Sequence, residues 1–279
     1  MRDSARPEHE IEIPQSFREM PRWWSDGTEW LDSLPGRIAD KCADWRLRPD
    51  GSALHGSNAI ALTVTRDGVL LPLRLTPPHS SFQLEIDALR FGDGRGTVLL
   101  FEHDSDAGAM LLERLETTET LASAPLIDAV PVIARLMRRL AVPANDSDVP
   151  STADVVEARA GMLEADWERL VKPFDRTILA QTLKIAQDLR ATPRNDAVNG
   201  DLHFDQILAG RREPWLAVDP VLLRGDIEYD LARILWTRLD EMNDDDEILF
   251  HFETVAREAQ LDRERAGKWV LYRSVDYWL

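Results

Sequence analysis

Two aspartates at the ends of short apolar segments are the strongest candidates for chemistry in this sequence. Asp219 follows residues 215–218, a short and partly β-prone run, and the next residue is a proline; this pattern predicts a buried strand with an acid at its end. Asp201 lies in a polar stretch just before a second strand candidate, residues 206–209. Two carboxylates and the amide of Gln206, carried near two strand ends, are enough to hold a metal ion and a base.

Phosphoryl-transfer enzymes of the protein-kinase type use this set of groups. In them a catalytic-loop aspartate orients the acceptor hydroxyl, while a carboxamide a few residues later and a strand-end aspartate hold Mg²⁺. On this basis Asp201 is the candidate catalytic residue, and Gln206 and Asp219 are the candidate Mg²⁺ ligands. His203 lies beside the same loop, and we expect it to pack or to donate a hydrogen bond rather than to act as a ligand.

Around these residues the sequence resembles the aminoglycoside phosphotransferases. Their signature is His-Gly-Asp, an Asn five residues after that Asp, and an Asp on a later strand. The resemblance is closest to the streptomycin 6-kinase-like branch, the aminoglycoside/hydroxyurea antibiotic resistance kinases, through residues 215–220 (WLAVDP) and 225–232 (GDIEYDLA). It covers most of the chain and is most specific over residues 199–236. Two positions depart from the signature: Asn199 stands where the family usually has His, and Gln206 where it usually has Asn.

The resemblance implies an α+β, protein-kinase-like fold of two lobes. Residues 1–113 would form an N-terminal lobe, with a helical arm and a small antiparallel β-sheet that covers the nucleotide. Residues 114–279 would form a mostly helical C-terminal lobe that carries the catalytic loop and the substrate pocket. The chain, at 279 residues, is long enough for one large domain or for two such lobes.

The residues upstream of the acids predict elements that would position a nucleotide. Apolar residues at helical spacing over residues 28–45, interrupted by Pro35, predict a kinked helix or two short helices, and residues 48–51 then predict a turn. Residues 54–64 form a glycine-containing bend into a strand, and residues 66–68 predict the turn of a hairpin. In kinase-like folds such a hairpin covers the nucleotide, whereas alone it indicates no more than a turn between strands.

The resemblance assigns nucleotide contacts to four places in this region. Arg74 occupies the position of the lysine that contacts the α- and β-phosphates in kinase-like folds, and it keeps the charge with a different reach. Glu85, on a predicted helix over residues 81–91, would pair with Arg74. The crossing between the lobes, at residues 113–115, would offer backbone groups to the adenine. The candidate nucleotide-binding residues are Gly56, Ser57 and Asn58 of the bend, Arg74, Glu85 and Glu113.

The segment after the second acid predicts a helix that begins near Ile227. Asp226 is a suitable N-cap for this helix and Glu228 suits its first turn. Asp230 has two interpretations. In the resembled fold an acid at this place supports the catalytic loop, and the alternative is an exposed acid that complements the helix dipole.

The remaining elements follow from periodicity and composition. The sequence predicts strands at residues 97–101 and 109–112, helices at 127–140, 153–191 with a break near Pro173, and 248–259, and a last helical segment at 269–278. The acidic run at residues 239–247 is typical of a solvated loop, and it would also suit the rim of a pocket for a cation. The chain stops without a polar tail, so we expect the sequence to be cut within a final helix.

Charge and composition exclude several classes of partner. The net charge of −17 argues against nucleic acid and against an anionic membrane, and it suits a cationic small molecule or simply a soluble surface. The single cysteine, Cys42, excludes an intrachain disulfide, and no Cys/His cluster has zinc spacing. Residues 1–14 lack the apolar run of a signal peptide, so we expect a cytoplasmic protein.

These observations predict an ATP- and Mg²⁺-dependent phosphotransferase whose acceptor is a hydroxyl of a small molecule, with streptomycin or a related cationic aminoglycoside as the leading substrate. Three alternatives stay open. The acceptor is hydroxyurea, an amino alcohol or a sugar; the donor is GTP; or the substitutions at Arg74, Asn199 and Gln206 mark a pseudokinase that binds nucleotide without transferring phosphate.

Overall fold

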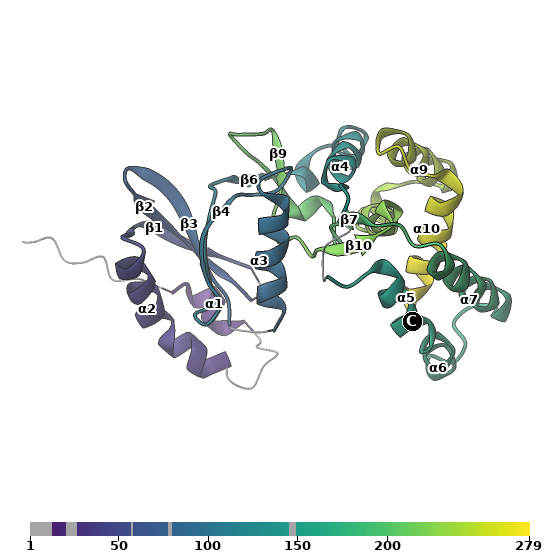
Figure 1. Cartoon of the computed structure of the whole chain (residues 1–279), viewed down its shortest axis with the longest axis horizontal. Helices are drawn as coiled ribbons and strands as arrows, with labels where there is room; N and C mark the ends of the chain where they lie inside the picture. Colours follow the sequence, from purple (N-terminus) through teal and green to yellow (C-terminus); the bar gives the residue numbers. More distant parts are fainter. Residues whose placement is uncertain (1–12, 21–26, 57, 78–79, 145–148) are drawn as a thin grey trace, which may run out of the picture. The chain divides into compact units, whose positions relative to one another are not determined.

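The computed structural model describes residues 13–20, 27–56, 58–77, 80–144 and 149–279 (Figure 1). The chain divides into two compact units. The first contains Met1–Ile86 and Val98–Arg114, and the second contains Asp87–Thr97 and Leu115–Leu279. The predicted division into lobes at residue 113 stays a prediction, and each unit is described by itself.

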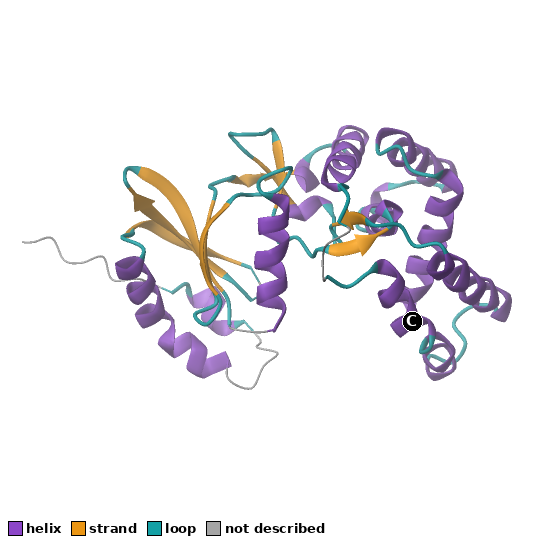
Figure 2. Ribbon diagram, in the orientation of Figure 1, coloured by secondary structure: helices purple, strands orange, loops and turns teal. Residues whose placement is uncertain are grey.

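The first unit is built on a five-stranded antiparallel sheet in the order β1-β2-β3-β5-β4 (Figure 2). Its elements are α1 (Gln15–Glu19), α2 (Gly27–Asp44), β1 (Arg48–His55), β2 (Ile60–Arg66), β3 (Val69–Leu75), β4 (Leu100–Asp104), β5 (Ala109–Leu112) and the first part of α3 (Ser80–Gly92). The predicted helix with an internal Pro35 is confirmed as α2, and the helix predicted at residues 81–91 is confirmed as α3.

The two faces of this sheet differ in burial, because successive residues of a strand point to opposite faces. Buried aliphatic residues alternate with partly exposed ones along β2 and β3, which are joined by the predicted hairpin turn at Asp67 and Gly68. The buried set packs against the apolar side of α2, which includes Leu34 and Ile38. Arg74 has the opposite parity and lies on the other face, on the side where Figure 1 shows α3.

Two of the predicted boundaries in this unit are wrong. The turn predicted at residues 48–51 is the start of β1, because the chain has already reversed direction at Arg46, whose φ is 56°. The turn-type residues there coincide instead with a shift of strand register between Pro49 and Ala53. The strand predicted at residues 97–101 begins only at Leu100, because Thr97 pairs with Ala217 in an isolated parallel bridge.

The second unit is mostly helical. Its helices are α4 (Leu126–Leu140), α5 (Thr152–Ala160), α6 (Leu163–Arg169), α7 (Arg176–Ala191), α8 (Leu231–Trp236), α9 (Asp245–Glu258) and α10 (Arg263–Trp278). Its strands form two small sheets, β6-β8-β9 (Glu116–Thr120, Ile207–Ala209, Trp215–Ala217) and β10-β7 (Leu223–Gly225, Asp196–Val198). Short 3₁₀ turns cover Leu121–Ser123, Phe204–Gln206, Ile227–Asp230 and Leu239–Glu241. Within the described ranges, every helix is too short or too polar to span a bilayer.

Two apolar clusters hold the second unit together. One joins α4 to α9, α8 and the short strands, and the other joins α5 and α7 to α10. Trp269 and Tyr272 of α10 are at most 1% exposed and their rings meet edge to face at 6.0 Å. The predicted helices at residues 127–140, 153–191 and 248–259 are confirmed, the second as three separate helices.

A buried carboxylate links the segment after β10 to the last helix. Asp226 is 1% exposed, and its Oδ2 accepts hydrogen bonds from Arg265 Nε and from Trp269 Nε1, both at 2.7 Å. Its Oδ1 accepts from the backbone N–H of Arg194 at 3.2 Å. Asp226 does occupy the predicted N-cap position, but its side chain makes no capping hydrogen bond, because these three donors engage both oxygens.

We expect Asp226→Asn to destabilise the protein by roughly 3–5 kcal/mol, because the substitution leaves Arg265 as a buried and unpaired cation. Urea denaturation followed by circular dichroism measures this loss. Asp188→Asn is the control. Asp188 is half-exposed and its ion pair with Lys268 is long, at 3.7 Å, so the substitution should lower the free energy of unfolding by about 0–1 kcal/mol. Equal stability of the two variants would contradict the assigned role of Asp226.

Candidate active site

Asp201 lies in the loop between β7 and the 3₁₀ turn Phe204–Gln206, and its side chain is 37% exposed. Oδ1 forms an ion pair with Arg233 Nε at 2.8 Å. Oδ2 lies 3.4 Å from Gln206 Nε2 and 3.9 Å from His203 Nε2. Oδ1 therefore has a charged partner, whereas Oδ2 has only two long contacts and the carboxylate stays partly exposed.

The backbone of this loop is held from two sides. Asn199 Oδ1 accepts a hydrogen bond from the N–H of Asp201 at 3.2 Å, and the N–H of Gly200 donates to Asp230 Oδ2 at the same distance. Gly200 has a φ of 81°, and a Cβ at this position would lie 2.8 Å from the carbonyl oxygen of Val221. Only glycine meets both requirements, the positive φ and the close approach of a second chain.

Asp230 is the buried support of the loop. It is 1% exposed and lies at the end of the 3₁₀ turn Ile227–Asp230, so the interpretation as a loop support is confirmed and the one as an exposed acid is wrong. Burial raises the pKa of its carboxyl group to about 7, against the opposing effects of Arg273 and of the Gly200 N–H. Asp230 thus titrates in the physiological range next to the loop that carries Asp201.

Asp219 follows β9, as the sequence predicts, although the strand itself ends at Ala217. The N–H of Val218 donates to the carbonyl oxygen of Gln206 at 2.8 Å, which ties the two acid-bearing segments together next to the acid. Asp219 has a φ of 50°, an uncommon conformation for a residue other than glycine. Strained backbone of this kind concentrates at functional sites.

The side-chain oxygen of Gln206 is a candidate ligand for a metal ion. While the Nε2 of Gln206 faces Asp201, the buried Oε1 has no hydrogen-bond partner among the described residues. An amide oxygen and a carboxylate are the ligand types of Mg²⁺, which takes one or two protein carboxylates and completes its shell with water and phosphate oxygens. The described residues contain no group of three or more His, Cys, Asp and Glu that could hold a metal ion by itself. The donor set therefore fits a metal ion that arrives with a nucleotide.

The predicted partners Arg74 and Glu85 form an ion pair inside the first unit, with side chains that are 16% and 14% exposed. The pairing is confirmed, and a role toward phosphate stays a prediction. Glu113 also has a structural partner, because its Oε2 accepts a hydrogen bond from the N–H of Leu99 at 3.1 Å.

The bend between β1 and β2 contains the remaining candidates. Gly56 and Asn58 are exposed, and the N–H of Gly56 donates to the carbonyl oxygen of Ala59 at 2.9 Å. Ser57 lies outside the described residues. The described candidates for nucleotide binding all belong to the first unit, whereas Asp201, Gln206 and Asp219 belong to the second.

Sequence reasoning missed Arg233, which is 24% exposed and pairs with Asp201 from α8. The only signal was a cation within an otherwise apolar helix start. Two aromatic contacts lie close to Arg233 in the sequence or in neighbouring elements. Trp236, one turn later in α8, stacks on Tyr277 with ring centroids 4.6 Å apart, and the guanidinium group of Arg273 lies 4.0 Å from the ring centroid of Tyr229.

The acidic run at residues 239–247 is more ordered than a loop. Asp244 caps α9 by accepting a hydrogen bond from the N–H of Glu247, and α9 begins at Asp245. Glu241 forms a two-pronged pair with Arg238, with both distances 2.6 Å. The last three residues of the run, 245–247, therefore begin a helix, and the use of the run as a pocket rim stays a prediction.

Comparisons with known proteins find relatives that match most of the chain. Residues 44–277 match the family model described as aminoglycoside/hydroxyurea antibiotic resistance kinase. A hydroxyurea phosphotransferase of Kitasatospora aureofaciens is 36% identical over 272 residues, which cover 95% of this chain and 78% of the relative. A streptomycin 6-kinase of Streptomyces griseus is 34% identical over 259 residues, which cover 89% of this chain and 83% of the relative.

A crystal structure of a choline kinase from Streptococcus pneumoniae has the same fold. Its TM-score is 0.62 at 14% sequence identity, and the match covers 88% of each chain. At this identity the likeness concerns the fold alone. The predicted α+β, protein-kinase-like architecture, with an antiparallel sheet followed by a mostly helical region, is confirmed.

The raised pKa of Asp230 predicts a specific pH dependence of stability. The folded protein holds the proton of this carboxyl group up to about pH 7, whereas the unfolded chain releases it near the ordinary pKa of 3.8, so the free energy of unfolding falls as the pH rises between these values. Asp230→Asn removes this titration, and we expect a smaller loss of stability between pH 5 and pH 8, by about 1.4 kcal/mol for each pH unit from pH 5 up to the folded-state pKa of about 7.

Urea denaturation of the wild type and of Asp230→Asn at the two pH values measures this effect. Asp240→Asn, at an exposed acid, is the matched control and should keep the wild-type slope. If Asp230→Asn also keeps that slope, the carboxyl group of Asp230 does not titrate as the burial implies.

Proposed function

The chain belongs to the aminoglycoside/hydroxyurea antibiotic resistance kinase family and is by that membership a small-molecule phosphotransferase, and we propose that it transfers the γ-phosphate of ATP to a hydroxyl group of a cationic aminoglycoside related to streptomycin. The observation that supports this most is the loop of Asp201, a partly exposed carboxylate on a backbone held by Asn199 and Asp230. A fixed, accessible carboxylate is what an acceptor hydroxyl requires.

In the proposed reaction the acceptor oxygen attacks the γ-phosphorus, the bond to the β–γ bridging oxygen breaks, and ADP leaves. Asp201 Oδ2 orients the hydroxyl and takes its proton, while Arg233 holds Oδ1 and so fixes the direction of the carboxylate. Asp219 and the amide oxygen of Gln206 would hold Mg²⁺, which supplies charge neutralisation on the phosphate oxygens when bound. In the first unit, Arg74 would bind phosphate while Glu85 fixes its guanidinium group.

The neighbourhood of Asp201 favours a second candidate acceptor. Arg233 places a permanent cation 2.8 Å from the proposed base, and a polycationic antibiotic would have to bind beside it. Hydroxyurea is small and neutral, and the relative at 36% identity is named a hydroxyurea phosphotransferase. The net charge of −17 favours the cation and Arg233 favours the neutral acceptor, so the two substrates have to be compared directly.

We expect the purified chain to release ADP from Mg²⁺-ATP in the presence of streptomycin or hydroxyurea, and Asp201→Asn to lower kcat by roughly 10²–10⁴-fold, the usual contribution of a general base. A coupled assay for ADP measures both. Asp205→Asn is the control, because its side chain is 72% exposed, and it should stay within about twofold of the wild type. Full turnover by Asp201→Asn would exclude Asp201 as the base.

Asp219→Asn tests the metal assignment separately from the chemistry. If Asp219 holds Mg²⁺, ATP should raise the melting temperature of the wild type only when Mg²⁺ is present, and this rise should disappear in the variant. Mg²⁺-dependent stabilisation of the wild type without ADP release from any acceptor would instead indicate a pseudokinase. A variant that keeps the full rise in melting temperature would contradict the role of Asp219.

A further inference from the structure

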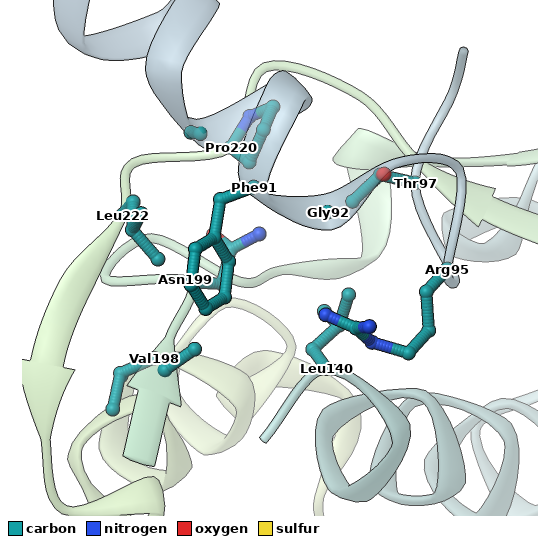
Figure 3. A pocket seen from close by; sticks show the side chains of 11 residues that line it. Phe91, Gly92, Arg95, Thr97, Leu140, Val198, Asn199, Pro220 and Leu222 are labelled. Carbon is teal, nitrogen blue, oxygen red and sulfur yellow. The ribbon is translucent and has the colours of Figure 1, made fainter. Parts of the chain in front are cut away.

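A pocket lies within the second unit, behind the two acid-bearing loops (Figure 3). Its apolar walls come from Phe91 at the end of α3, Leu140 at the end of α4, Val198 of β7 and Leu222 before β10. The space amounts to about 350 Å³, part of it open to solvent. The described residues that the sequence predicts to bind nucleotide or metal all lie outside its lining.

Three polar side-chain atoms in the wall of this pocket lack a hydrogen-bond partner among the described residues. The Nδ2 of Asn199, the Oγ1 of Thr97 and the Nε of Arg95 are buried, and none has a hydrogen-bond partner in the part of the chain that the structure describes. Asn199 and Thr97 are 6% and 2% exposed. Buried polar groups are nearly always satisfied, so three unpaired ones around a single space indicate a missing occupant.

The orientation of the Asn199 amide follows from its other contact. Its Oδ1 is engaged by the N–H of Asp201, so Nδ2 has to point away from that backbone. Figure 3 shows the nitrogen of Asn199 among the pocket-lining side chains, with Arg95 reaching toward the same space from the loop after α3. The loop itself is held in place by Arg212, which donates to the carbonyl oxygens of Gly94 and Thr97 at 2.6 and 2.8 Å.

The chemistry of the lining defines the class of ligand. The Asn199 and Arg95 groups can only donate hydrogen bonds, Thr97 can donate as well, and Arg95 carries a permanent positive charge. No carboxylate lines the pocket. The complementary molecule has an anionic acceptor at one end and an apolar body that covers Phe91, Leu140, Val198 and Leu222.

We propose that this pocket binds a small apolar carboxylate, and that its occupancy adjusts the positions of the two catalytic acids. Asn199 in its wall stands two residues before Asp201, and Pro220 in its wall directly follows Asp219. A ligand that fixes both walls therefore acts on the chain immediately next to each acid. The binding is independent of the proposed function, whereas its effect on turnover rests on that function.

The test of binding uses para-fluorobenzoate as the probe and fluorine NMR as the readout, without nucleotide or acceptor. We expect saturable binding, weaker by about tenfold or more for Arg95→Leu, because a charge-assisted hydrogen bond is lost, and abolished by Leu222→Trp, which fills the space. Arg90→Leu is the matched control. Arg90 is exposed on α3 and does not line the pocket, so this substitution should leave the affinity unchanged. The neutral para-fluorobenzamide should bind the wild type more weakly than the carboxylate.

The proposal is overturned if the wild type does not bind the probe, or if Arg95→Leu and Leu222→Trp bind it as the wild type does. Coupling is tested next, by following ADP release while benzoate is added. A change of kcat or KM that occurs in the wild type and in Arg90→Leu, but not in Leu222→Trp, supports coupling, and equal responses of all three proteins reject it. A chain that transfers no phosphate fails only the proposed function, because the NMR titration needs no turnover.

Discussion

A carboxylate that contacts a substrate has to be accessible and also has to keep one position. In this protein the hydrogen bond from the N–H of Gly200 to the buried carboxyl group of Asp230 holds the backbone next to Asp201, while the Asp201 side chain stays partly exposed. The loop that carries Asp201 is partly exposed at Gly200 and Asp201, and its neighbours Leu202 and Phe204 anchor it in the apolar core of the second unit. Asp230 holds it from beneath, and Asp226 in turn fastens the segment that leads to Asp230 to the last helix. Burial of these two acids is costly, and their donors offset that cost.

The segment of the second acid, Asp219, is held by a backbone hydrogen bond. Asp219 adopts a left-handed backbone conformation that the neighbouring strand pairing enforces, since Val218 is hydrogen-bonded to the backbone of Gln206. Gln206 contributes its side chain to the site and its main chain to the strand contact. This hydrogen bond and the strand pairing between residues 207–209 and 215–217 therefore hold together the backbone segments that carry the amide oxygen and the acid proposed for the metal.

Three residues replace those that are usual in this family or in kinase-like folds, and they keep the physical roles in different ways. Arg74 pairs with a glutamate as the family's lysine is expected to, and Gln206 offers an unpaired amide oxygen. Asn199 supports the loop through its oxygen and presents its nitrogen to the pocket behind it. The change at residue 199 therefore adds an unpaired donor next to the catalytic loop, which is what connects that pocket to the site.

The sequence by itself determined the family, the fold class and the two acids, because these depend on local pattern: a strand that ends in an acid, glycine before an aspartate, and helices with one apolar face. It did not determine the partners of these residues. The ion pair between Arg233 and Asp201, the raised pKa of Asp230 and the unpaired groups of the pocket arise from side chains that are brought together across long stretches of chain. Burial and distance decide the charge and the hydrogen bonds of such groups, and only the tertiary structure supplies both.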